Sequence, residues 1–261
     1  MAAAPDPAAP EPAAIFGPAD ILGPVEPGAP KVALAVTAHP DDVDFGAGGT
    51  VARMVDDGWR VVYCLATDGD AGGFDAAVPR GEIPAIRRAE QTEAARLLGV
   101  LELHWLGFAD GRVEPTIDLR REISRVIRTV QPTRILAQSP QRNWVRMGAS
   151  HPDHLAVGEA TLRAVYPDAR NPFAHPELAA AGLDAWAVPE VWMMGGPDPD
   201  LWVDISPTFD RKLAALRAHV SQEVDRNGEL EQRLRTWMAA PAASGLPPDR
   251  TAEAWRRIDT R

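Results

Sequence analysis

Three polar side chains at the end of an apolar run are the first candidates for chemistry. Residues 32–36 are small or β-branched, which is typical of a buried parallel strand, and the run stops at His39-Pro40-Asp41-Asp42. Proline cannot continue a hydrogen-bonded ladder, and in open α/β sheets ligands bind where strands end. Because imidazole nitrogen and carboxylate oxygen both bind zinc, His39 and Asp42 could hold one ion and leave Asp41 free beside it.

A second histidine motif makes a metal site a better interpretation than a simple turn. A lone His-Pro-Asp-Asp would favour a turn in which an aspartate caps the next helix, because Asp and Pro are common turn residues. Residues 151–154, His-Pro-Asp-His, repeat the pattern later in the chain, again before a helical stretch. A catalytic zinc site has three protein ligands and one open position. His39, Asp42 and one histidine of the second motif would complete that set.

With these two motifs the chain resembles the PIG-L/LmbE-like zinc deacetylases, a family that removes acetyl groups from N-acetylglucosaminyl compounds. The resemblance spans about residues 31–225. It is carried by AHPDD at 38–42, TDGDAG at 67–72, RRAE at 87–90 before LGV at 98–100, LGFADG at 106–111 and HPDH at 151–154. The two histidine motifs, in this order, are specific, whereas the intervening segments are weak signals alone.

The residues and the resemblance together predict a division of roles. His39, Asp42 and His154 are assigned as ligands of one Zn²⁺ per chain, with Fe²⁺ as an alternative native metal. Asp41, next to a ligand, is placed to take a proton from water as general base and to return it to the leaving amine. His151 could be a fourth ligand when neutral or stabilise an oxyanion when protonated, and the resemblance favours the second. Asp153 would hydrogen-bond a histidine and raise its pKa.

Two further residues are assigned to substrate binding. An arginine at the position of Arg87 contacts the substrate sugar in the family, and the alternative here is an ion pair with Glu90, which shares its helix face. Asp110 would point into the mouth of the same active site, or else be an ordinary turn residue. His219, in an Ala-His-x-Ser-Gln segment that the family also has, is expected behind the site rather than as a ligand.

One position departs from the family pattern. A relative of the mycothiol pathway has a catalytic tyrosine two residues before its second histidine motif, where this chain has Ala149. Either the enzyme does without that group, or Trp144 or another residue of the loop occupies the space. The predicted activity is hydrolysis of an N-acetyl group from an amino-sugar conjugate. The alternatives are an amidase that cleaves a larger amide, such as a mycothiol S-conjugate, and a non-catalytic sugar-binding protein.

Composition excludes several other classes. The chain has 261 residues, of which 45% are apolar, enough for one sizeable core. Its net charge of −10 argues against nucleic-acid binding, because an acidic surface repels phosphates. The single cysteine, Cys64, lies in an apolar run and is expected to be buried and inert. We find no membrane-spanning stretch and no secretory signal, so we expect a cytoplasmic protein and allow for a homo-oligomer.

Strands and helices alternate along the chain, which predicts a single Rossmann-like α/β domain. Its doubly wound, mostly parallel sheet would have helices on both faces and the active site at the carboxyl ends of its strands. We expect strands at 32–36, 59–67, 101–106, 134–138, 190–194 and 201–205, and helices at 46–57, 83–98, 117–130, 153–165 and 207–220, the last capped by Ser206. Residues 1–30 are predicted to be a mostly disordered leader, 31–225 the catalytic domain, and 226–261 a C-terminal helical extension.

Overall fold

The structure is a computed structural model that describes residues 22–261, so most of the predicted leader lies outside the described part. One seven-stranded sheet has the order β3-β2-β1-β4-β5-β7-β6. The strands are β1 (Val32–Thr37), β2 (Arg60–Thr67), β3 (Glu102–Phe108), β4 (Arg134–Gln138), β5 (Glu190–Met194), β6 (Leu201–Asp204) and β7 (Ala252–Asp259). The first five are mutually parallel, whereas β7 runs antiparallel to both β5 and β6.

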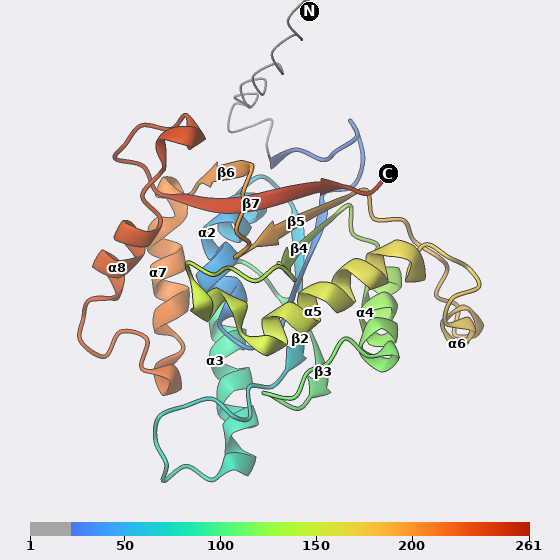
Figure 1. Ribbon diagram of the computed structural model, residues 1–261, viewed down its shortest axis with the longest axis horizontal. Coiled ribbons are helices and arrows are strands. Elements are labelled where there is room, and N and C mark those ends of the chain that lie inside the picture. Colours follow the sequence, from blue (N-terminus) through green and yellow to red (C-terminus); the bar gives the residue numbers. More distant parts are fainter. Residues whose placement is uncertain (1–21) are drawn as a thin grey trace, which may run out of the picture.

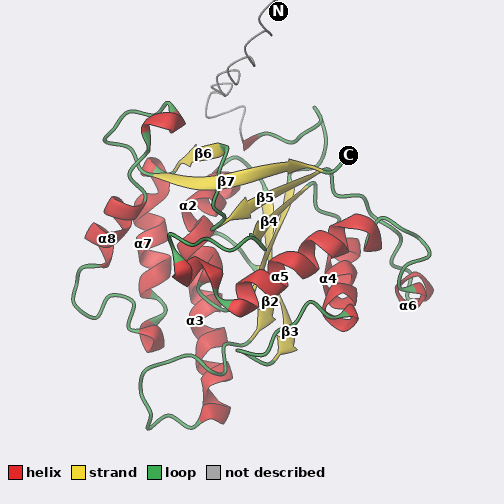
Figure 2. Cartoon of the chain, viewed as in Figure 1, coloured by secondary structure: helices red, strands yellow, loops and turns green. Residues whose placement is uncertain are grey.

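Helices cover both faces of this sheet (Figures 1 and 2), as the predicted fold class requires. They are α2 (Asp42–Asp56), α3 (Ile83–Leu98), α4 (Ile117–Val130), α5 (Pro152–Arg163), α6 (Pro176–Ala180), α7 (Phe209–Arg217) and α8 (Leu230–Trp237). Alternate residues of β1 divide the core in two. Ala33 and Ala35 pack in a cluster with residues of α2, α3, α7 and α8, while Leu34 and Val36 pack with α4 and α5.

The predicted fold class is confirmed, and several element boundaries agree with the sequence-based ranges. The bounds of α3, α4, β4 and β5 match those expected. The predicted helix at 207–220 is wrong at both ends, because a 3-10 turn (Ser206–Thr208) comes first and α7 ends at Arg217. Ser206 does not cap α7, since its side chain bonds the backbone and side chain of Thr251.

The C-terminal segment differs most from expectation. Residues 226–261 were predicted to be helical, but only α8 is an α-helix, and β7 is an internal strand between β5 and β6. The alternation that marks a strand is weak here because Arg256, Arg257 and Asp259 follow Trp255 without a regular apolar pattern. The last segment of the chain is therefore part of the sheet. No helix of residues 22–261 is both long and apolar enough to cross a membrane.

Candidate functional site

The fold explains why two histidine motifs far apart in sequence meet in space. β1 and β4 are parallel neighbours in the sheet, at the point where the strand order reverses direction. The first motif follows β1, and the loop after β4 leads to the second motif at the start of α5. Gln138, the last residue of β4, accepts a hydrogen bond from the backbone N–H of Ala38 at 2.9 Å and ties the two strand ends together.

The three predicted ligand residues lie close enough to one another to share one ion. Oδ1 of Asp42 is 3.0 Å from Nε2 of His154, Oδ2 of Asp42 is 3.4 Å from Nδ1 of His39, and the two histidine nitrogens are 3.3 Å apart. Zinc ligands about 2.0–2.1 Å from a tetrahedral ion are separated by roughly 3.3–3.4 Å. The residues present therefore fit a metal ion. His39, His151 and His154 also form a group whose nitrogens lie within 4.8 Å of one another.

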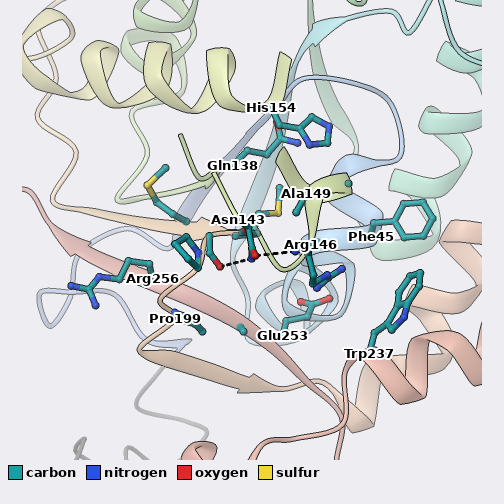
Figure 3. Close-up of a pocket in the computed structure, with 18 of the residues that line it drawn as sticks. Phe45, Gln138, Asn143, Arg146, Ala149, His154, Pro199, Trp237, Glu253 and Arg256 are labelled. Carbon is teal, nitrogen blue, oxygen red and sulfur yellow. Dashed lines mark hydrogen bonds between the residues drawn. The ribbon is translucent and has the colours of Figure 1, made fainter. Parts of the chain in front are cut away.

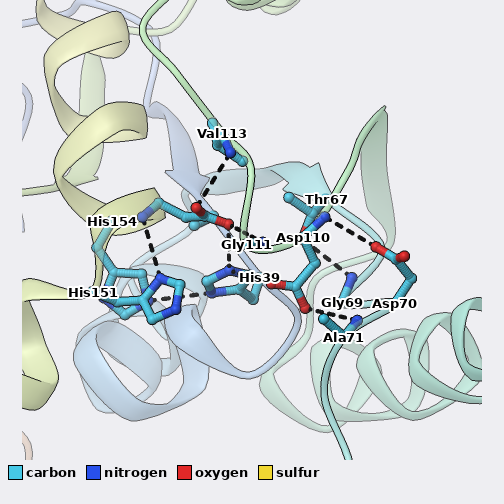
Figure 4. Close-up of polar contacts among 12 residues, drawn as sticks. His39, Thr67, Gly69, Asp70, Ala71, Asp110, Gly111, Val113, His151 and His154 are labelled. Carbon is cyan, nitrogen blue, oxygen red and sulfur yellow. Dashed lines mark hydrogen bonds and ion pairs between the residues drawn. The ribbon is translucent and has the colours of Figure 1, made fainter.

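The far side of His39 is held by two carboxylates. Its Nε2 atom lies 3.1 Å from Oδ1 of Asp110 and 3.1 Å from Oδ2 of Asp153 (Figure 4). Burial opposes the charged form, but hydrogen bonds to Asp110, Asp153 and Asp42 raise the pKa of His39 to about 12. A carboxylate behind a histidine fixes the ring's orientation in metal sites. Here it directs Nδ1 of His39 toward Asp42 and His154.

The sequence did not show that Asp110 and Asp153 share one partner, His39. Asp153 also accepts hydrogen bonds from the backbone of Gly111 at 2.7 Å and Val113 at 3.3 Å, so it is fixed from both sides. Asp110, predicted to contact substrate, uses Oδ1 for His39 and accepts from the backbone of Ala71 with Oδ2 at 3.1 Å. With both oxygens engaged and the side chain buried, Asp110 lies behind the candidate ligand rather than in the mouth.

His151 lies beside the two candidate histidine ligands, and a hydrogen bond from the backbone defines its proton position. Its Nδ1 accepts a hydrogen bond from the N–H of Asp153 at 3.2 Å, which caps α5. Its ring centroid is 5.0 Å from that of His39 and 5.3 Å from that of His154. Burial and the neighbouring His39 and His154 hold the pKa of His151 below its usual value. Of the three histidines, His39 and His154 instead have a raised pKa, and a neutral His151 carries its proton on Nε2.

Asp41 is free of the candidate ligand set and has the properties of a base. Its φ angle of 82° places it in the left-handed region, and its backbone N–H donates to Oε1 of Gln91 at 2.7 Å. Burial and the adjacent charge of Asp42 raise the pKa of Asp41 to about 7, although Arg87 opposes this. Nη2 of Arg87 lies 3.1 Å from its carboxylate.

Arg87 is a buried residue rather than one exposed to a ligand. Only 4% of its side chain is exposed, and Nη1 donates to the carbonyl oxygen of Gly69. A Cβ on Gly69 or Gly72 would lie 2.2 or 2.3 Å from Nη1, so a larger residue at either position would displace this guanidinium. The alternative ion pair with Glu90 is not observed, because Glu90 accepts hydrogen bonds from Ser221.

A buried network connects Asp41 to His219, which lies just after α7. Gln91, which holds the backbone of Asp41, donates to Oδ2 of Asp44 at 2.9 Å. The same oxygen lies 2.8 Å from Nε2 of His219. His219 is fully buried and has no contact with the candidate ligands, so it lies behind the site as predicted. Burial opposes its charge, but the hydrogen bond and charge of Asp44 raise the pKa of His219.

Sequence analysis did not predict a buried ion pair between Lys212 and Glu253. Nζ of Lys212 on α7 lies 2.7 Å from Oε1 of Glu253 on β7 and also donates to two carbonyl oxygens of α2. Glu253 accepts from the backbone N–H groups of Gly49 and Thr50, in the middle of α2. Both side chains are fully buried. Because α2 begins with Asp42, this pair supports the helix that carries a candidate ligand.

A cavity of about 780 Å³ opens beside Asp42 and His154 (Figure 3). Its walls come from the loop before α5, the end of β5, and the C-terminal α8 and β7. Ala149, at the position of the family's tyrosine, lines this cavity together with Trp144, but Trp144 is 78% exposed and lies at its rim. The sequence of residues 226–261 alone did not indicate that they line this cavity.

Comparisons with known proteins identify a family and several relatives. The family model "PIG-L: GlcNAc-PI de-N-acetylase" matches residues 34–165. The chain is 37% identical over 207 residues to diacetylchitobiose deacetylase of Thermococcus kodakarensis, covering 79% of this chain and 76% of the relative. It is 35% identical over 196 residues to a probable N-acetyl-α-D-glucosaminyl L-malate deacetylase 2 of Bacillus cereus, covering 72% and 82%.

A solved structure extends the match to most of the chain. N,N'-diacetylchitobiose deacetylase from Pyrococcus horikoshii superposes with a TM-score of 0.78 at 29% identity, covering 88% of this chain and 84% of that one. The family model includes both histidine motifs and every residue predicted for the site. On these grounds, the chain belongs to the PIG-L family of de-N-acetylases.

Proposed function

We propose that this protein is a zinc-dependent hydrolase that removes the acetyl group from an N-acetylglucosaminyl conjugate. The observation that carries the proposal is the spacing of Asp42, His39 and His154 as ligand atoms with Asp41 beside them and outside the set. A protein that only binds sugar has no need of a carboxylate that lies beside the ligand set, outside it, and whose pKa burial raises to about 7. Relatives named as deacetylases of diacetylchitobiose and N-acetylglucosaminyl malate support the same reaction.

His39, Asp42 and His154 would hold the metal, because their atoms have the required spacing and donor chemistry. When bound, zinc supplies a Lewis acid for the amide carbonyl and lowers the pKa of water at its open position. The carboxylates of Asp110 and Asp153 keep His39 in the orientation in which Nδ1 can be a ligand. Fe²⁺ remains an alternative native metal, since its ligand preferences overlap with this set.

Asp41 and His151 would move and stabilise the charges of the reaction. Asp41 accepts a proton from the attacking water and then delivers it to the nitrogen of the leaving amine. His151, with Nδ1 occupied by the backbone of Asp153, presents Nε2–H to the oxygen of the amide as negative charge develops there. A neutral donor suffices for this role, which agrees with the lowered pKa of His151.

The decisive experiment is to measure acetate and free amine together. The purified protein is stripped with a chelator, reloaded with Zn²⁺ or Fe²⁺, and incubated with N-acetylglucosamine, N,N'-diacetylchitobiose and an N-acetylglucosaminyl malate. We expect equal amounts of acetate and amine, and loss of both products after chelation. Release of an acid larger than acetate from amide conjugates would favour the amidase. Sugar binding without any product, at one metal per chain, would refute a hydrolase.

A further inference from the structure

The cavity beside the candidate metal site is larger than one sugar needs. Its volume of about 780 Å³ lies within the range of about 300–1,000 Å³ that holds drug-sized ligands, whereas one N-acetylhexosamine is smaller than such a ligand. Asp42 and His154 line one part of the cavity, and Trp237 and Met238 line another. An acetyl group held at the metal would therefore leave most of the cavity to the group attached to the sugar.

The walls away from the metal are strongly apolar. Apart from the backbone of glycines, the lining includes Phe45, Met193, Met194, Leu234 and Met238. The charged side chains that line it, apart from Arg146, are already paired: Asp42 with His154, Glu253 with Lys212, and Arg256 with Asp200. The guanidinium of Arg146 lies over the ring of Trp237, 5.8 Å from its centroid. The amides of Gln138 and Asn143, which also line the cavity, bond to the backbone, so most of the remaining lining is apolar.

The rim of the cavity exposes large apolar side chains to solvent. Trp144 and Val145 on the loop before α5 are 78% and 94% exposed, and Trp237 at the end of α8 is 54% exposed. All three line the cavity, so they form one surface rather than scattered residues. A group of exposed apolar side chains beside a pocket marks a binding surface. This rim is continuous with the metal site, which argues that its occupant is part of the substrate.

We propose that Val145 and Trp237 form the subsite for an apolar aglycone, so that the preferred substrate is an N-acetylglucosaminyl conjugate with an alkyl or aryl group. The proposal rests on the deacetylase activity proposed above and narrows its substrate class. Diacetylchitobiose and the malate conjugate, after which two relatives are named, are hydrophilic and would leave this surface unused. The apolar group would lie between the loop before α5 and the end of α8, over the cavity's methionines.

A homologous series of substrates tests the aglycone directly. The metal-loaded protein is assayed for acetate release from methyl, butyl, hexyl and octyl N-acetylglucosaminides. Burial of each methylene contributes about 0.8 kcal/mol, so kcat/KM should rise about fourfold per added methylene until the cavity is filled. The octyl compound should also exceed N,N'-diacetylchitobiose. Equal kcat/KM along the series would overturn the inference while leaving the deacetylase intact, and failure of every compound, the methyl glycoside included, would refute the deacetylase itself.

Variants locate the effect on the proposed subsite. Trp237→Ser and Val145→Ser should each raise KM for the octyl substrate, by about tenfold for the tryptophan, and leave the methyl substrate within about twofold. Phe173→Ser is the matched control, because Phe173 is 89% exposed and does not line the cavity. Because Val145 is almost fully exposed, its variant should fold even if the end of α8 is disturbed by Trp237→Ser. A dimer that becomes a monomer in these variants, with unchanged chain-length preference, would show that a second copy covers the surface instead.

Discussion

The Nη2 atom of Arg87 lies 3.1 Å from Oδ2 of Asp41 and 2.7 Å from the carbonyl oxygen of Pro40, so one guanidinium holds both the base and its backbone. We expect Arg87→Ala to lower kcat as well as raise KM, because the base loses its position even with substrate bound. Steady-state kinetics with N,N'-diacetylchitobiose would measure the two effects. A raised KM with unchanged kcat would instead support a pure sugar contact, and Arg88→Ala, on the same helix but paired with Asp68, is the control.

Replacing the base itself should separate catalysis from metal binding. Asp41→Asn keeps the shape of the side chain and removes its proton affinity, and positioned proton transfer contributes about 10²–10⁴ in rate. We expect a loss of kcat on that scale with metal content unchanged. Elemental analysis of the purified variant provides the second measurement. A variant that retained full activity would show that another group takes the proton.

The ligand assignment predicts a sharp difference between the two histidines of the second motif. His154→Ala removes an atom 3.0 Å from Oδ1 of Asp42 and should lose metal, as should Asp42→Ala and His39→Ala. His151→Ala removes a ring whose Nδ1 bonds only the backbone N–H of Asp153, and it should retain metal. Metal content and affinity are measured by titration after chelation. If His151→Ala lost metal as severely as His154→Ala, then His151 would be a ligand.

The buried pair beneath α2 predicts a large stability effect. Glu253→Gln leaves the ammonium group of Lys212 buried without its carboxylate, and breaking a buried pair costs about 3–5 kcal/mol. Urea unfolding should show a loss of that order in the free energy of unfolding. The control is Asp57→Asn at the Lys31–Asp57 pair, whose side chains are 36% and 42% exposed, and which should cost under about 1 kcal/mol. Equal losses of unfolding free energy in the two variants would contradict the conclusion that the buried Lys212–Glu253 pair supports α2.

The contact between His219 and Asp44 predicts a pH-dependent contribution to stability. Because the folded pKa of His219 is raised, its contribution is fully present below the unfolded value of about 6.5 and is lost as pH rises through the folded pKa. The stability difference between the metal-free wild type and His219→Gln should therefore be larger near pH 6 than near pH 9. Unfolding curves at both pH values measure it. A difference that grew toward alkaline pH would exclude a charged histidine at this position.

Local sequence patterns were sufficient to predict the strands and helices that position the candidate site. The apolar run of β1, followed by a proline, predicted a strand that ends at His39, and strand–helix alternation predicted the parallel sheet. That topology brings the second motif beside the first. The family resemblance, confirmed by the comparisons, supplied the roles of individual residues. Whether those roles hold in this chain stays a prediction for each of them.

The parts that sequence analysis missed depend on contacts between distant segments. Asp110 was assigned to substrate because its loop follows β3, but only the folded chain shows that His39 reaches its carboxylate. The sequence could not show whether Arg87 contacts the substrate or is buried, since its burial depends on how it packs against Gly69 and Gly72. Glu253 gave no signal at all, because a single glutamate in a polar stretch looks like a surface residue until β7 enters the sheet.

The position of β7 has a consequence for the order in which the protein is made. Glu253 holds the backbone of Gly49 although 204 residues separate them, so α2 lacks its support until the last strand has been synthesised. β6 likewise has no neighbour in the sheet before β7 arrives, since β7 is its only partner among the described strands. The segment through Glu253 must therefore be synthesised before the candidate ligand on α2 has this support. Metal capture is expected to follow the synthesis of β7 rather than precede it.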